Sequence, residues 1–174
     1  MIIGSLLSRF EHRPALRTKT MILEDLKRKI KEIVAKAQLL SAKHTNEGSA
    51  AVNYACIFTQ NLKEFEELLS LTAQMGRIAE QTAMGPVFQI EPLETVAGTL
   101  QLLKIRRPDP KRPEQGDADF TVSNYETFKR TYLSKPGFSL ITRPQMEMIE
   151  LADPSYDVLA YYSHPTLSEV LKLD

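Results

Sequence analysis

Apolar residues recur every three or four positions across residues 21–42, and this spacing places them on one face of a helix. Thr20 precedes this pattern and could cap the helix, while Glu24 and Asp25 fall in the first turn, where acids complement the helix dipole. We therefore predict an amphipathic helix in the N-terminal segment 21–44. Its apolar face is formed by Ile22, Leu26, Ile30, Ile33, Ala37 and Leu40.

After residue 50, short apolar runs alternate with turn residues, which is typical of strands. The run at 52–58 predicts a strand, and Asn61 then predicts the cap of a short helix. A proline-rich, charged stretch at 107–116 is expected to be a surface loop or linker. Between the helix and this loop we expect three strands, at 78–83, 87–93 and 99–106.

The same order of elements returns after the loop. Residues 118–122 predict a strand, and Asn124 predicts a helix cap 63 positions after Asn61. Self-similarity at a long period is typical of a duplicated unit. Three strands are expected to follow, at 139–143, 146–151 and 158–162, with a short helix inside the C-terminal segment 166–174.

These patterns predict an α+β fold. Two tandem βαβββ units, at about 50–107 and 117–165, would form one domain with paired curved mixed sheets around a cleft. A cleft between two such sheets is a common place for a ligand.

Composition narrows the class of protein. The 174 residues hold 22 basic and 22 acidic side chains, so the chain is not a strongly basic nucleic-acid binder. No apolar run approaches the roughly 18 residues that a membrane helix needs. The single cysteine, Cys56, excludes a disulfide framework. We expect a cytoplasmic protein with no nucleic-acid partner and no membrane span, and the composition leaves a small-molecule ligand and a homodimer open.

The charge is unevenly distributed. Residues 1–44 carry ten basic and four acidic side chains, whereas 45–174 carry twelve and eighteen. The basic arm could bind an acidic partner or could pack against its own acidic body. Residues 1–20 could be a transit segment or a loosely docked tail.

The duplicated order resembles the vicinal oxygen chelate superfamily, which includes glyoxalases, bleomycin-resistance proteins and extradiol dioxygenases. Residues 117–124 (DADFTVSN) are similar to the start of that family's unit, and 148–161 (MIELADPSYDVLAY) to its end. The preceding helix and the proline-rich join are similar to the YecM-like branch. The resemblance covers about residues 50–165.

Members of this superfamily usually bind a divalent metal through His and Glu on the first and last strands of each unit. The resemblance places Tyr54, Asp117 and Ala160 at three of those positions, and the fourth near Gln101. These side chains lack the imidazole and thiolate groups that suit zinc, iron or nickel. The resemblance therefore implies a small-molecule-binding protein that has lost the metal site, with no metal and no cofactor. We expect its ligand to contact Tyr54, Gln101, Asp117, Asp119 and Glu150.

Two other functions stay open. A metal-dependent isomerase or lyase of the glyoxalase type could use a weak oxygen site of Asp117, Asp119 and Glu150. A regulatory module could bind its partner through the basic N-terminal helix.

Several single residues have two interpretations each. Asp117 and Asp119 share one face of a strand, which lines either a wet cleft or open water. In a cleft, their mutual repulsion would raise one pKa. His164 is either a general base or a turn residue, and Cys56 is either a buried inert thiol or a nucleophile.

Two further groups of side chains could contact a ligand. With Tyr54, the C-terminal tyrosines could stack on a planar ligand or form the rim of a sheet; they are Tyr156, Tyr161 and Tyr162. The basic residues around the proline-rich loop could hold an anion or lie in water; they are Arg106, Arg107, Lys111 and Arg112.

Overall fold

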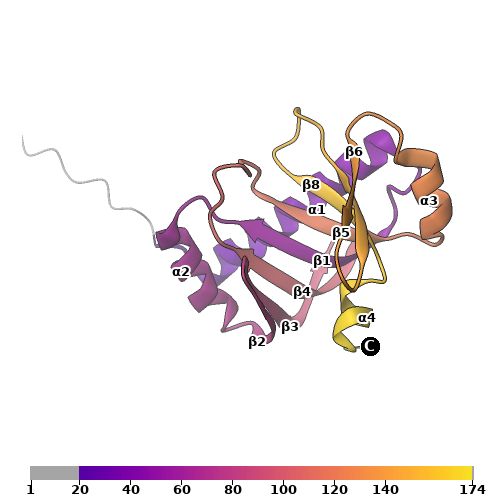
Figure 1. Cartoon of the computed structure of the whole chain (residues 1–174). Coiled ribbons are helices and arrows are strands. Elements are labelled where there is room, and N and C mark those ends of the chain that lie inside the picture. Colours follow the sequence, from indigo (N-terminus) through magenta and orange to yellow (C-terminus); the bar gives the residue numbers. More distant parts are fainter. Residues whose placement is uncertain (1–19, 174) are drawn as a thin grey trace, which may run out of the picture.

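The computed structural model of the chain describes residues 20–173 and has an α+β fold, as predicted (Figure 1). Residues 1–19, where the transit segment or tail was expected, lie outside the described residues. The elements follow in the order α1 (Leu23–His44), β1 (Ala51–Phe58), α2 (Leu62–Thr72), β2 (Gly76–Thr82), β3 (Gly85–Thr95), β4 (Gly98–Arg106), β5 (Gly116–Thr121), α3 (Tyr125–Tyr132), β6 (Phe138–Thr142), β7 (Glu147–Leu151), β8 (Leu159–His164) and α4 (Leu167–Leu171).

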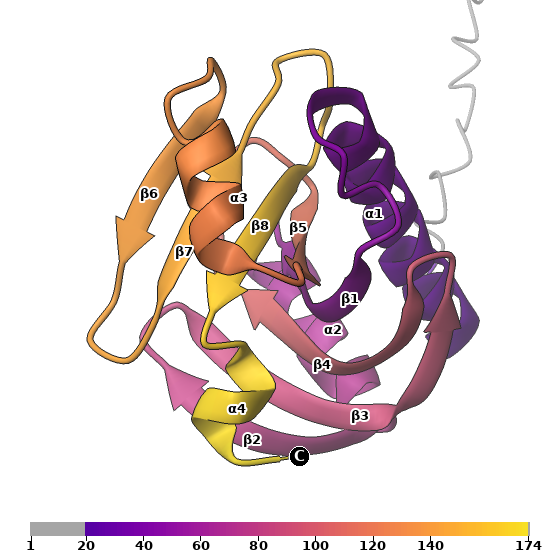
Figure 2. The same cartoon turned by 90° about the vertical axis from the view of Figure 1, so that its right-hand side faces the viewer.

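The eight strands form one sheet in the order β2-β3-β4-β1-β5-β8-β7-β6. β1 is parallel to β4 and β5 is parallel to β8, and the other neighbours are antiparallel. The expected pair of sheets is thus one continuous sheet, whose halves meet at the antiparallel pair β1 and β5. Figure 2 shows how the sheet curves between the strands β6–β8 and the strands β2–β4.

The helices α1, α2 and α3 cover one face of the sheet. In Figure 1, α1 runs behind the sheet, and it contacts β1, β5, β8 and α2. The predicted apolar face of α1 is buried apart from Ile22, which is 54% exposed, and Leu26, Ile30 and Ile33 pack into the main core. The helix therefore covers the sheet of its own chain.

Ion pairs join α1 to the acidic body. Lys29 Nζ lies 2.6 Å from the Glu64 carboxylate, and Lys36 Nζ lies 2.9 Å from that of Asp157. Lys43 Nζ and His44 Nε2 both lie 2.8 Å from Asp153. Of the two interpretations of the basic arm, the described residues therefore support the one in which the arm packs against the acidic body of its own chain.

Two of the three predicted helix caps are confirmed. The side chain of Asn61 accepts a hydrogen bond from the backbone N–H of Glu64, and that of Asn124 accepts one from Thr127. The prediction for Thr20 is wrong, because α1 begins after Ile22. The N–H of Ile22 donates to the carboxylate of Asp25 at 3.2 Å, so the cap lies two residues further along the chain.

The other face of the sheet is concave, and α4 packs at one end of it. Leu167 of α4 lies against Val87 of β3 and Leu102 of β4. In Figure 2, α4 lies below β8, and it also contacts β1. Among helices in the described part of the chain, none combines the length and apolar character needed to cross a membrane.

Candidate functional site

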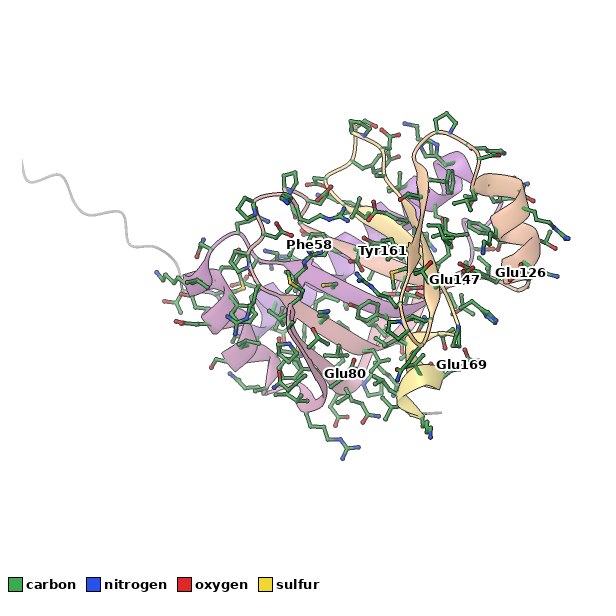
Figure 3. All side chains as sticks on the ribbon, in the orientation of Figure 1. Phe58, Glu80, Glu126, Glu147, Tyr161 and Glu169 are labelled. Atoms are coloured by element: carbon green, nitrogen blue, oxygen red, sulfur yellow. The ribbon has the colours of Figure 1, made fainter. Side chains whose placement is uncertain are left out.

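The concave face of the sheet and α4 enclose a cavity of about 620 Å³. A volume of this size suits a small organic molecule. Both halves of the sheet contribute to the lining, and Figure 3 labels Phe58 on β1, Tyr161 on β8 and Glu80 on β2. The polar and charged lining residues of the central strands and the 107–116 loop are Tyr54, Cys56, Lys104, Arg106, Arg112, Asp117, Asp119 and Tyr161.

Strand register places three of these residues in one row. Lys104 of β4 is paired with Cys56 of β1, and Cys56 is paired with Asp117 of β5. Since neighbouring strands lie about 4.8 Å apart and paired residues point to the same face, Lys104 and Asp117 lie on either side of the buried thiol. The next pair along, Tyr54 with Asp119, extends the polar surface.

Asp117 carries a buried oxygen that is free to bind a ligand. The residue is 5% exposed, and its Oδ1 has no hydrogen-bond partner among the described residues. Burial raises the pKa of its carboxyl well above the usual range, and the charge of Asp119 raises it further. A buried oxygen left without a partner costs roughly 1–3 kcal/mol, so such groups are expected at binding sites rather than in inert cores.

Asp119 is also buried, but both of its oxygens are engaged. Oδ1 accepts a hydrogen bond from the backbone N–H of Ser163 at 3.1 Å, and Oδ2 accepts one from the Ser163 hydroxyl. Burial raises the pKa of Asp119 to about 7, although the two bonds from Ser163 act to lower it. The two aspartates therefore differ. Asp119 is hydrogen-bonded to β8, whereas Asp117 faces the cavity with no hydrogen bond to a described residue at its Oδ1.

Three cationic side chains of β4 and the 107–116 loop line the cavity together with this acidic pair, and Arg143 lines it from the β6–β7 hairpin. Lys104 has no hydrogen bond or ion pair with any described residue. Arg106 donates to Asp109 at 2.9 Å and its guanidinium lies 4.9 Å from the ring centroid of Phe58, yet its Nε is buried without a partner.

The third cation, Arg112, is held by Glu150. Its Nη2 donates to Glu150 Oε2 at 2.9 Å, and the Tyr161 hydroxyl donates to the same oxygen. Burial opposes the charge of Arg112, but Tyr161 and Glu150 outweigh it and raise the pKa of the guanidinium. Glu150 is not in the cavity lining itself, and it positions two residues that are.

The structure separates the five residues predicted to contact a ligand. Tyr54, Asp117 and Asp119 line the cavity, and Glu150 supports it through Arg112 and Tyr161. Gln101 is exposed and lies outside the cavity. A register shift on β3 between Gln89 and Leu93 lies opposite it.

The structure also decides between the interpretations that the sequence left open for His164, Cys56 and the C-terminal tyrosines. His164 is exposed, lies outside the cavity and stacks on the ring of Tyr125 at 5.2 Å between centroids. Cys56 lines the cavity, but burial raises the pKa of its thiol well above the ordinary value, which disfavours a nucleophile. Of the C-terminal tyrosines only Tyr161 reaches the cavity; Tyr162 is fully buried in the core on the helix side.

The basic residues around the loop divide in the same way. Arg106 and Arg112 line the cavity, whereas Arg107 and Lys111 are exposed and lie outside it. Lys104 was not among the residues predicted to contact a ligand. The alternation of side chains along β4 could have indicated its position. Leu103 and Ile105 are buried in the core, so Lys104 between them faces the opposite side of the sheet.

The side chains that line the cavity do not fit the divalent metal that members of the vicinal oxygen chelate superfamily usually bind. No group of three or more His, Cys, Asp or Glu side chains within residues 20–173 is arranged to hold an ion. Both oxygens of Asp119 are engaged by Ser163, and the cationic Lys104 lies in the same row as Asp117. Ala160, at another of the expected positions, is buried in the core under the helices.

A second hollow of about 730 Å³ lies between α2 and the β2–β3 hairpin. Phe65, Ile78 and Phe88 line it, and its charged lining residues are Arg77 and Arg107. It contains no buried carboxyl group, and we therefore take the concave cavity as the candidate site.

Comparison with known proteins supports the fold alone. No protein-family model matches the chain, and no curated protein matches it. A solved structure described as "Structural Genomics, Protein EC4020" is similar over 87% of this chain and 92% of its own, with a TM-score of 0.67 and 14% sequence identity.

Proposed function

We propose that this chain is a small-molecule-binding protein of the vicinal oxygen chelate type that lacks the usual metal ligands. The observation that carries the proposal is the buried, unpartnered carboxyl oxygen of Asp117 on the wall of a cavity large enough for an organic ligand.

The topology supports the assignment to that type. The element order β1-α2-β2-β3-β4 is followed by β5-α3-β6-β7-β8, and the strand order is mirrored about the pair β1 and β5. This is the arrangement expected of two tandem βαβββ units. A cytoplasmic location and a homodimer stay predictions.

The two alternatives have less in their favour. The isomerase or lyase would need a metal, and the donor set does not fit one. The regulatory module would need a free helix, and most of the apolar face of α1 is buried against its own sheet.

The test is a fluorescence titration of the full chain with N-phenylnaphthylamine, an uncharged probe that emits strongly in apolar surroundings. We expect binding of one probe per chain. Met148→Trp should abolish it, because Met148 is a half-buried lining residue whose enlargement fills the cavity.

The matched control is Ala73→Trp, which enlarges an exposed residue in the second hollow. It should leave the titration unchanged. Circular dichroism of both variants establishes that they are folded. If no probe binds, or if binding survives Met148→Trp and is lost with Ala73→Trp, the proposal fails.

A further inference from the structure

Two buried polar atoms that lack a hydrogen-bond partner among the described residues, Arg106 Nε and Asp117 Oδ1, belong to residues that line the concave cavity. We infer that its ligand is a small organic anion with an apolar body, whose charged end is held by Lys104 and Arg106 beside the carboxyl of Asp117. This inference rests on the proposed function and goes beyond it by naming the class of ligand.

The polar end of the cavity has donors without partners. Lys104 Nζ makes no ion pair or hydrogen bond within the described residues, and Arg106 Nε is buried without a partner. Lys104 is only partly buried, whereas a buried donor such as Arg106 Nε costs stability unless something accepts its hydrogen bond. A carboxylate, sulfonate or phosphate oxygen would accept from both, and hydrogen bonds to an ionised acceptor are about twice as strong as neutral ones.

The charges of the lining point to the same class of ligand. Arg106 is paired with Asp109 and Arg112 is paired with Glu150, so these four charges balance. Lys104 makes no ion pair with a described residue, although its charge acts on the nearby carboxyl of Asp117. Glu80 and Arg143 also line the cavity. A negatively charged ligand group could therefore pair with Lys104.

Asp117 helps an anion rather than repelling it when its carboxyl is protonated. A neutral carboxyl donates one O–H bond, and burial favours the neutral form. The anion would then receive a hydrogen bond from Asp117 as well as from the two cations. The other titratable or charged groups that face Asp117 are Tyr54 and Cys56 on β1, Lys104 and Arg106 on β4, Asp119 on β5, Glu150 on β7, Tyr161 on β8 and Arg112 in the loop.

The far side of the cavity is mainly apolar. The β6–β7 hairpin and α4 contribute Ile141, Met146, Met148, Leu167 and Val170 to it, and the hairpin also contributes Arg143, Pro144 and Gln145. Methionine side chains adapt to ligands of varied shape, so this part suits an apolar body without fixing its outline. The cavity as a whole therefore fits an amphipathic anion.

The experiment compares two probes that differ by one charged group. Anilinonaphthalene sulfonate carries a sulfonate, and N-phenylnaphthylamine has the same ring system without it. We expect the wild-type chain to bind the sulfonate more tightly. Lys104→Met should weaken the sulfonate about tenfold and leave the uncharged probe unchanged, because only the charged end meets the ammonium group.

Arg77→Met is the matched control, since it removes one cation from the second hollow. It should change the affinity for neither probe. If the sulfonate weakens with Arg77→Met and not with Lys104→Met, the inference is overturned. If both probes bind the cavity equally and Lys104→Met affects neither, the cavity is an apolar site, so the proposed function stands and the inference fails.

A second measurement tests the role of Asp117. The affinity of the wild-type chain for the sulfonate should fall as the pH rises and the carboxyl ionises. Asp117→Asn keeps an uncharged donor, so its affinity should stay higher and depend less on pH, with Asp119 responsible for the dependence that remains. A wild-type affinity that rises with pH would overturn the role given to Asp117.

Discussion

The carboxylate of Asp119 accepts two hydrogen bonds from a single residue, Ser163, one from its backbone N–H and one from its hydroxyl. These bonds tie β5 to β8 on the concave side of the sheet, where both residues are buried. They also fix Asp119 so that Asp117 alone presents a free oxygen to the cavity.

Ser163→Ala removes the hydroxyl donor and should raise the pKa of Asp119 above about 7, because that bond lowers it. The expected loss is about 2 kcal/mol in the free energy of unfolding at pH 8, where the lost bond is to a charged group. At pH 5 the loss should be about 1 kcal/mol. Urea denaturation at pH 8 and at pH 5 measures the two losses, with the exposed Ser139→Ala as control. An equal loss in the free energy of unfolding at the two pH values would contradict the prediction.

Stability should depend on pH through the buried aspartates. Since the folded-state pKa of Asp119 is raised to about 7, the folded chain holds a proton that the unfolded chain releases near pH 3.8. The contribution to stability is complete below pH 3.8 and is lost as the pH rises towards 7, by at most about 1.4 kcal/mol per pH unit. Asp117 acts in the same direction.

The measurement for this second prediction is the free energy of unfolding between pH 4.5 and 7.5 for the wild type and for Asp119→Asn. The slope should be shallower in the variant. Glu147 and Asp153 have lowered pKa values and so act mainly below pH 4.5, outside this window. A wild-type stability that increases from pH 4.5 to 7 would argue against raised carboxyl pKa values.

The packing of α1 on the sheet gives a third prediction. Ile30 is fully buried, so Ile30→Ala should cost about 2–5 kcal/mol through lost burial and the cavity that remains. Leu39 lies on the same helix and is 62% exposed, so Leu39→Ala should cost less than about 0.5 kcal/mol. Urea denaturation of the two variants tests whether α1 belongs to the core. Similar small losses would mean that the helix is dispensable for folding.

Gly116 gives a fourth prediction, because the backbone of β1 comes close to it. A Cβ at this position would lie 2.1 Å from the carbonyl oxygen of Cys56 and 3.0 Å from the Cδ1 of Ile33. Gly116→Ala should therefore cost about 3 kcal/mol, since the pair β1 and β5 must separate.

The control for Gly116→Ala is Gly98→Ala. Gly98 has a φ of +98° with nothing within 4 Å of the added Cβ, so only backbone strain of about 1–2 kcal/mol is expected there. Thermal unfolding ranks the two variants, and a larger loss for Gly98→Ala would contradict the close approach at Gly116.

Much of the fold could be predicted from local patterns. The periodicity of α1 and the caps Asn61 and Asn124 are local signals, and each appears where the sequence placed it. The order of strands in the sheet depends on pairing between distant segments. The sequence indicated it only through the offset between the two halves.

The site was harder to predict, because it depends on register. Asp117 and Asp119 could be placed on one strand face, but the choice between water and a cleft needed the other strands. Around Gln101 the strand β4 does not alternate regularly, because Leu100 packs into the main core whereas Leu102 packs against α4. This irregularity lies opposite the register shift on β3 between Gln89 and Leu93, so it depends on a neighbouring strand that local sequence does not reveal.

The central pair β1 and β5 has a consequence for any bound molecule. Asp117 comes from one half of the chain and Lys104 from the other, and the halves are joined in the sheet along that single seam. A molecule that bound both side chains would connect the two halves of the sheet across the β1–β5 pair. Occupancy would then slow the opening of the halves, and the protection of β1 and β5 amide protons from exchange would report it.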